Sequence, residues 1–162
     1  MKVSLIKNNC MKSLSQFFIL SIFLSVLFCF TQCKKDKGPL NITLYDKPLS
    51  TIQNYIQGKW KCHYGKGGIA ANNIQYYNNL FWIITTTSKI QISNNGNITT
   101  DTTINWIKDV APYTNGDSTF IMSFFDKLGY PANYVVDKII NDTLILHETA
   151  VDAVFYHFTK SN

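Results

Sequence analysis

The side chains of this chain that can do chemistry are few and lie far apart in the sequence. There is one glutamate, Glu148, and there are nine aspartates, most of them in or beside apparent turns. The three histidines, His63, His147 and His157, have no partner at the spacing of a metal site. No serine lies in the Gly-X-Ser-X-Gly pattern of hydrolases. We therefore expect no catalytic residues, no metal and no other cofactor.

The turn signal at Asn141-Asp142 sets an expected register for the last two strands. A second short turn is expected near Ala150-Val151, between these two strands. His147 then lies opposite Val154, and His157 lies opposite Leu144. The two histidines then project from opposite faces of the sheet. They are not expected to act as a pair.

Three other candidates for chemistry have structural interpretations. Asp137 and Lys138 are neighbours in one expected strand, so their side chains should point to opposite faces and form no pair. The glycine-rich stretch 65–73 contains Lys66 but lacks the spacing of a phosphate-binding loop, so we expect a flexible rim loop. Cys62 lies on an inward face, and we expect a buried free cysteine.

The beginning of the chain has the pattern of a targeting segment. Three lysines among the first twelve residues precede a largely apolar run at Phe17–Phe30. This run is 14 residues long, which is shorter than the roughly 20 residues of a membrane-spanning helix. Either Met1 or Met11 can serve as the start, and an uncleaved anchor or an ordinary secretory signal remains an alternative.

The residues after the apolar run, Gln32-Cys33-Lys34, resemble the lipid-attachment site of bacterial lipoproteins, in particular those of the Bacteroidetes type. In such proteins the cysteine becomes the lipidated first residue of the mature chain. The resemblance implies a signal peptide at 1–32, a lipidated Cys33, a tether at 33–47 and a folded domain at 48–162. Lysine after the lipidated cysteine implies the outer membrane.

Composition limits the classes of partner. The formal charge is +5, but three of the 15 lysines lie in the signal. The remainder has 12 lysines and 10 acidic residues, a net charge of about +2. The sequence contains no arginine, which is the usual residue for recognising phosphates and base edges. We therefore expect no nucleic-acid partner.

The segment around Trp60 is the first long strand of the expected domain. By the strand period of two, Trp60, Cys62 and Tyr64 share an apolar face, and the lysines between them share the opposite, polar face. A short helix should precede it, because Leu49, Ile52, Tyr55 and Ile56 recur at helical spacing. Ser50 or Thr51 would cap this helix.

The remaining chain alternates between β-strand patterns and turn signals. Asn94–Asn97 and Asn141-Asp142 predict tight hairpin turns, because Asn and Gly tolerate positive φ. Strands after the first are expected at 80–86, 88–93, 98–106, 118–126, 134–140, 143–148 and 153–160. We therefore predict an all-β fold, an eight-stranded antiparallel up-and-down barrel or flattened sandwich.

Two parts of the chain are similar to lipocalin-like domains of Bacteroidetes lipoproteins. Gly58-Lys59-Trp60 after a short helical turn resembles the Gly-X-Trp motif of lipocalins. The runs Tyr134–Leu146 and Phe155–Lys160 resemble the last strands of those domains. The likeness spans residues 48–160. The lipocalin arginine that packs over the first-strand tryptophan is absent, and Lys160 is its only candidate replacement.

This resemblance implies a barrel whose interior holds either side chains or one small ligand. Six aromatic residues are the candidate ligand-binding side chains: Trp60, Tyr64, Trp82, Phe120, Tyr134 and Phe155. Rings at this density also favour a filled interior.

The sequence thus predicts a non-catalytic, lipid-anchored protein of the cell envelope that binds a small apolar ligand. The loops around 65–79 and 110–117 are its expected contact region. The alternative is a structural or interaction module with a filled barrel and an envelope protein as partner. A small hydrolase or isomerase is a third interpretation, without support from particular residues.

Overall fold

A computed structural model of the chain describes residues 38–69 and 73–161. The predicted signal peptide and Cys33 lie outside the described residues. The fold belongs to the compact unit that begins at Pro39. None of the helices in the described ranges has the length and apolar character needed to cross a bilayer.

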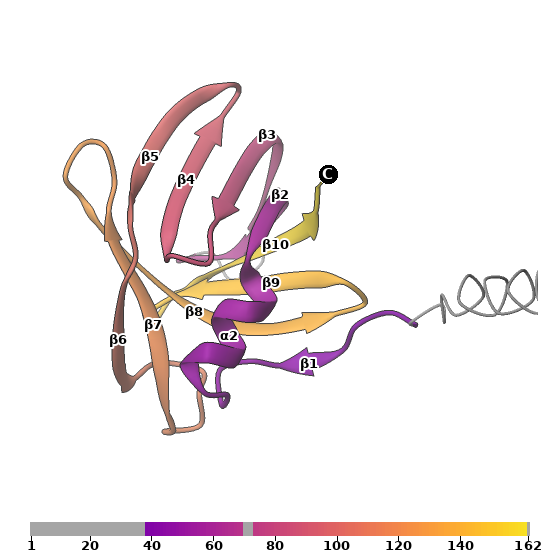
Figure 1. Ribbon diagram of the computed structural model, residues 1–162, viewed down its shortest axis with the longest axis vertical. Coiled ribbons are helices and arrows are strands. Elements are labelled where there is room, and N and C mark those ends of the chain that lie inside the picture. The colour runs from indigo at the N-terminus through magenta and orange to yellow at the C-terminus, as the bar shows by residue number, and fades with distance from the viewer. Residues whose placement is uncertain (1–37, 70–72, 162) are drawn as a thin grey trace, which may run out of the picture. The chain divides into compact units, whose positions relative to one another are not determined.

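The described residues form one short helix and ten strands (Figure 1). In chain order they are β1 (Ile42–Thr43), α2 (Leu49–Ile56), β2 (Gly58–Gly67), β3 (Ile74–Ile84), β4 (Lys89–Asn94), β5 (Asn97–Thr103), β6 (Asn105–Val110), β7 (Ser118–Phe125), β8 (Pro131–Ile140), β9 (Thr143–Glu148) and β10 (Val154–Lys160).

All strands belong to one curled antiparallel sheet, which confirms the prediction of an all-β fold. Its order is β5-β4-β3-β2-β10-β9-β8-β7-β6, and β1 adds to β8 outside this path. The two ends of the path, β5 and β6, are consecutive in the chain and separated by Ile104 alone. The sheet therefore curls until its first and last strands meet at that residue (Figure 1).

The number and bounds of the strands differ from the expected eight. The single strand predicted at 98–106 is divided at Ile104, where the chain leaves β4 and begins to pair with β7. The Ile104 side chain is buried, and its N–H donates to the carbonyl of Ser88 at 2.7 Å. The strand predicted from Leu80 begins earlier, at Ile74. The turns at Asn95-Gly96 and Asn141-Asp142 do adopt the positive φ that their residues predict.

Two β-bulges change the faces expected for particular side chains. In β2 the pairing with β10 shifts between Cys62 and Tyr64, so Tyr64 leaves the inner face that holds Trp60 and Cys62. In β8 the pairing with β9 shifts between Val136 and Lys138. One extra residue in a strand reverses the alternation beyond it, which a period of two cannot anticipate.

The last hairpin is shifted by one residue from the predicted register. His147 pairs with Phe155 instead of Val154, and His157 pairs with Ile145 instead of Leu144. A shift of one residue moves every side chain of a strand to the other face. His147 and His157 therefore project from the same, outer face, and Leu144 belongs to the inner one.

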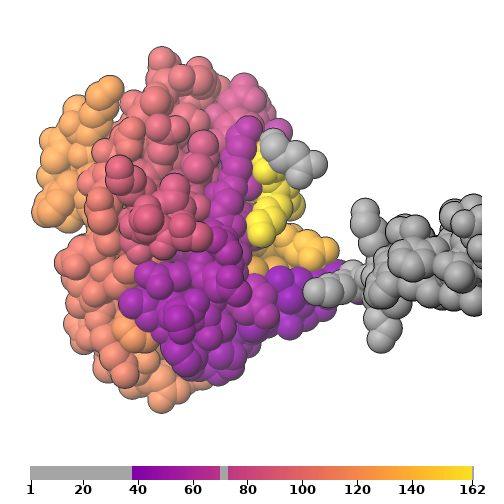
Figure 2. All heavy atoms as spheres, in the orientation of Figure 1, coloured from indigo at the N-terminus to yellow at the C-terminus, as the bar shows by residue number. Residues whose placement is uncertain are grey.

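The hydrophobic core lies on the inner face of the curled sheet, and α2 packs against it. Ile52 and Ile56 of α2 are fully buried, and Figure 2 shows the helix (purple) in contact with pink and orange atoms of neighbouring strands. The helix begins after Pro48, whose carbonyl accepts the N–H groups of Thr51 and Ile52. Pro48 is thus the N-cap residue, and the predicted cap by Ser50 or Thr51 is wrong.

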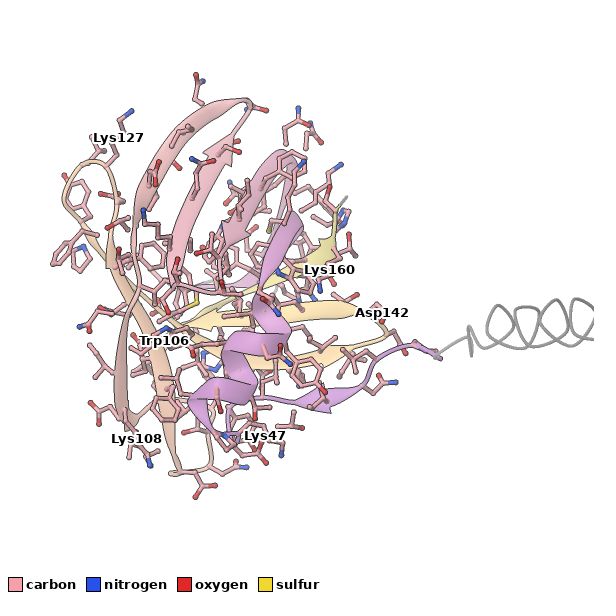
Figure 3. The ribbon with its side chains drawn as sticks, viewed as in Figure 1. Lys47, Trp106, Lys108, Lys127, Asp142 and Lys160 are labelled. Carbon is pink, nitrogen blue, oxygen red and sulfur yellow. The ribbon has the colours of Figure 1, made fainter. Side chains whose placement is uncertain are left out.

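Trp60 connects the helix to the C-terminal end of the domain. Its indole N–H donates to the carbonyl of Ile56 at 2.7 Å. The Nζ atom of Lys160 lies 5.4 Å from the ring centroid, so Lys160 does pack over this tryptophan as its position predicted. Figure 3 shows Lys160 near the C-terminal end of the chain.

Part of the segment expected to be a tether is packed against the sheet. Ile42 and Thr43 pair with Ile139 and Lys138, and the Leu44 side chain is fully buried. The N–H of Leu40 donates to Oδ1 of Asp142 at 2.9 Å, beside the β8–β9 turn labelled in Figure 3. The ordered domain therefore includes residues before position 48.

Substitution of Gly67 tests the close approach of β2 to the β9–β10 turn. Gly67 has a φ of +127°, and a Cβ there would lie 2.3 Å from the carbonyl oxygen of Ala153. Gly129 has a φ of +85° with open space around it, so Gly129→Ala isolates the backbone strain. We expect G129A to lower the free energy of unfolding by about 1 kcal/mol and G67A by at least about 2 kcal/mol more. Urea unfolding followed by circular dichroism measures both, and equal losses would contradict the clash.

Candidate functional site

The outer face of the sheet carries an open cleft of about 630 Å³. This volume lies within the range of small-molecule binding sites. The walls come from the end of β2, the β6–β7 loop, β8, β9 and the β9–β10 hairpin. The residues lining the cleft are Lys66, Gly67, Gly68, Tyr113, Asp137, Lys138, Ile145, Val151, Asp152, Ala153, Phe155 and His157.

The two β-bulges determine which side chains lie in or beside this cleft. In β2 the bulge brings Tyr64 to the outer face, where its ring stacks on His157 with centroids 4.3 Å apart and an interplanar angle of 17°. In β8 the bulge places Asp137 and Lys138 on the same side. Their Oδ2 and Nζ atoms lie 3.4 Å apart, so the prediction that they form no pair is wrong.

The loop 111–117 folds back over the outer face and forms an aromatic wall. Tyr113, with a φ of +66°, places its ring 5.2 Å from Phe155 and 5.5 Å from His147. Its hydroxyl donates to the carbonyl of Val151 at 2.5 Å. Thr114 is fully buried, and its Oγ1 lies within hydrogen-bonding distance, 2.7 Å, of the carbonyl oxygens of both Ala111 and Asp117. The loop is therefore a packed part of the cleft and holds Tyr113 in place.

The charges at the cleft are mixed. Asp137 is only 8% exposed, whereas the side chain of Lys138 is 38% exposed. Burial lowers the pKa of His157, and the positive charges of Lys66 and Lys138 lower it further. His157 is therefore neutral at pH 7, with one ring nitrogen able to donate and the other to accept. The cleft thus offers two carboxylates, Asp137 and Asp152, two ammonium groups and an imidazole beside aromatic rings.

The predicted ligand-binding residues do not converge on one site. Trp82 and Tyr134 lie together on the inner face, with ring centroids 5.1 Å apart. Trp60 is buried beside α2, and Phe120 packs at the edge of the same core. Tyr64 and Phe155 lie on the outer face.

Aromatic side chains occupy the space around Trp82. Besides Tyr134, Trp82 contacts Phe158 at 5.1 Å and Phe124 at 6.2 Å between centroids, all at steep angles. Edge-to-face contacts of this kind stabilise a packed core. The indole N–H of Trp82 is buried and has no hydrogen-bond partner in the described part of the chain.

Other candidate chemical groups have structural roles. Burial raises the pKa of the Cys62 thiol to about 12, as expected for an inert core cysteine. The Nε2 atom of His63 lies 2.7 Å from Oγ1 of Thr159. No group of three metal-ligating side chains occurs within 38–69 and 73–161.

A site shared by four residues was not predicted from the sequence: Tyr113, Asp137, Lys138 and His157. The sequence does contain a pattern that indicates the outer face. Along two adjacent strands, core residues alternate with Ile145, His147, Phe155 and His157. Its interpretation required the correct register and both bulges. Residues 65–67, predicted to belong to a rim loop, are part of β2, and Lys66 lines the cleft from that strand. Tyr113 lines it from the predicted loop at 110–117.

Replacing Lys138 with Gln tests the electrostatic coupling in the cleft. Loss of its positive charge should raise the pKa of His157 by a few tenths of a unit, whereas Lys89→Gln, on β4, should leave it unchanged. NMR titration of the His157 ring protons measures the pKa. Folding lowers the pKa of His157, so below a pH of about 6.5 the folded state binds fewer protons than the unfolded state. The contribution of His157 to the free energy of unfolding therefore decreases as the pH falls through this range. An unchanged pKa in K138Q would contradict the arrangement.

Comparison with known proteins gives this site no assignment, since no protein-family model, curated protein or solved structure matches the chain.

Proposed function

We propose that this chain is a lipid-anchored, non-catalytic binding protein of the cell envelope, and that its ligand binds in the outer cleft of a lipocalin-like domain. One contrast carries the proposal. The inner face is packed with rings around Trp82, whereas the outer face has an open cleft of about 630 Å³. We therefore assign the ligand of this proposal to the outer cleft.

The groups at the cleft define the class of ligand. The rings of Tyr113 and Phe155 would cover an apolar part of a small molecule. Asp137, Lys66 and Lys138 would bind polar groups at the edge of this molecule. His157 would donate a hydrogen bond to it or accept one from it. A small organic molecule with one apolar face and several polar substituents fits this arrangement.

The cellular location forms part of the same proposal. A lipid on Cys33 would hold the domain at the outer membrane, through a short charged stretch that ends where Leu40 contacts Asp142. The short helix before Gly58-Lys59-Trp60, the contact between Lys160 and Trp60 and the antiparallel order of the strands support the lipocalin-like assignment.

A protein partner is the second candidate, favoured by the β7–β8 hairpin. Phe125, Leu128 and Tyr130 are 63%, 81% and 66% exposed at its tip. Oδ1 of Asp126 accepts the N–H groups of Leu128 and Tyr130 at 2.9 and 2.8 Å, which fixes the turn. Exposed apolar side chains on a rigid turn are typical of a contact surface between proteins.

Native mass spectrometry of the full-length lipoprotein, purified gently from its parent cells, tests the binding site. We expect a discrete added mass that disappears on denaturation. Lys66→Glu should reduce the bound fraction at least about tenfold, because it reverses one charge of the cleft. Lys89→Glu, the same change outside the cleft, should retain the ligand. A protein without added mass would favour the protein partner, and retention in K66E would place the ligand elsewhere.

Replacement of Cys33 tests the lipid anchor. Cys33→Ser should abolish incorporation of a labelled fatty acid and release the protein from the membrane fraction, because the thiol that carries the lipid is gone. Cys29→Ser, four residues earlier in the apolar run, should still incorporate the label. Label retained in C33S and lost in C29S would contradict the assignment.

A further inference from the structure

A second group of side chains gathers on the inner face, where β8 begins and β9 ends. Glu148, the only glutamate of the chain, lies directly opposite Tyr134. The hydroxyl of Tyr156 donates to its Oε1 at 2.9 Å, and the N–H of Val154 donates to Oε2 at 3.4 Å. Tyr77 of β3 completes what we call the tyrosine–glutamate cluster: Tyr77, Tyr134, Tyr156 and Glu148.

The ring of Tyr156 contacts both other rings of the cluster. The ring centroids of Tyr134 and Tyr156 are 5.8 Å apart at 75°, and those of Tyr77 and Tyr156 are 6.3 Å apart at 29°. Burial raises the pKa of all three phenols, and the charge of Glu148 contributes to each increase. The three side chains therefore remain neutral at pH 7 and bring no charge to the cluster.

Glu148 has no cationic side chain beside it. The ion pairs within 4.0 Å among the described residues are Lys47 with Asp46 and Lys138 with Asp137, and neither involves Glu148. The groups that donate to its carboxylate, the Tyr156 hydroxyl and the Val154 N–H, are neutral. The faces of aromatic rings also attract cations, so both kinds of group in the cluster favour a positive ligand.

The cluster opens to an accessible space. A cleft of about 270 Å³ is lined by residues that include Tyr134 and Glu148, together with Asn133 and Thr149. It shares no lining residue with the outer cleft. Tyr134 and Glu148 therefore border a cleft with room for a small polar head group.

We infer that the tyrosine–glutamate cluster binds an organic ammonium group, with Glu148 as the counter-charge and the ring of Tyr134 as the aromatic wall. Tyr156 would hold the Glu148 carboxylate in place through its hydroxyl. The ammonium group belongs either to a free amine or to the head group of a lipid. Both present the same chemistry, a positive nitrogen carrying alkyl groups. This site is independent of the outer cleft and of the function proposed for it.

Choline chloride is the probe, and 3,3-dimethyl-1-butanol, its neutral isostere, is the matched control. Each is titrated into the full-length protein in a choline-free, non-ionic detergent while the amide resonances of Tyr134 and Glu148 are followed by NMR. We expect choline to bind at least about tenfold more tightly than the isostere, because only choline carries the charge. Equal affinities would overturn the proposal.

Substitutions within the cluster separate charge from ring contacts. Glu148→Gln keeps an acceptor for Tyr156 but removes the charge, and should weaken choline binding about tenfold. Tyr134→Phe keeps the ring and should bind within about twofold of the wild type, whereas Tyr134→Leu should lose affinity. Asp137→Asn removes a charge from the outer cleft and should have no effect. If E148Q fails to fold, the comparison of Y134F with Y134L still tests the contribution of the ring. Equal choline affinities of these two variants would contradict the proposed site.

Vesicles distinguish the two sources of the ammonium group. Competition with choline by phosphatidylcholine vesicles, but not by phosphatidylglycerol vesicles, assigns the site to a lipid head group. Competition by neither, with choline binding intact, assigns it to a soluble amine. Equal competition by both kinds of vesicle would show that the displacement ignores the head group and would count against the site.

Discussion

The packing of rings around Trp82 is the interaction on which the rest of the structure depends. Trp82 belongs to β3, and its neighbours Phe124, Tyr134 and Phe158 belong to β7, β8 and β10. These contacts join strands that are far apart in sequence across the inner face of the curled sheet, and α2 adds Ile52 and Ile56 to the same core. Since aromatic rings occupy this space, accessible chemistry lies on the outer face and at the ends of the strands.

Much of the architecture could be predicted because local residue chemistry determines it. Asn95-Gly96 and Asn141-Asp142 specify tight turns through their tolerance of positive φ, and the apolar spacing in 49–56 specifies the helix. The faces of side chains beyond a bulge could not be predicted, because one additional residue reverses the alternation. Tyr64, Asp137 and Lys138 were misplaced for this reason, and His147 through a one-residue shift in the last hairpin. Asp137 and Lys138 line the outer cleft, and the rings of Tyr64 and His147 lie beside those of its lining residues His157 and Phe155, so the cleft could not be recognised from sequence.

The positions of the binding surfaces follow from the direction of β8. The chain enters the domain beside the β8–β9 turn, where Leu40 contacts Asp142, and the exposed hairpin lies at the other end of this ten-residue strand. Figure 3 labels both ends, with Asp142 at one and Lys127 of the hairpin at the other. At about 3.3 Å per residue, they are roughly 30 Å apart. Glu148 pairs near the hairpin end, so the inferred ammonium site and the exposed apolar residues share the end that is distant from the point of entry.

The central claim is that aromatic rings fill the space around Trp82 and that the ligand of the proposed function binds in the outer cleft. Xenon enters apolar cavities that are empty and leaves packed cores unchanged. The most direct test is therefore NMR of the full-length protein under xenon pressure, with the indole N–H of Trp82 as the reporter. We expect its resonance to stay constant. A saturable shift at Trp82, shared by Phe124 and Phe158, would reveal an internal cavity and contradict the account.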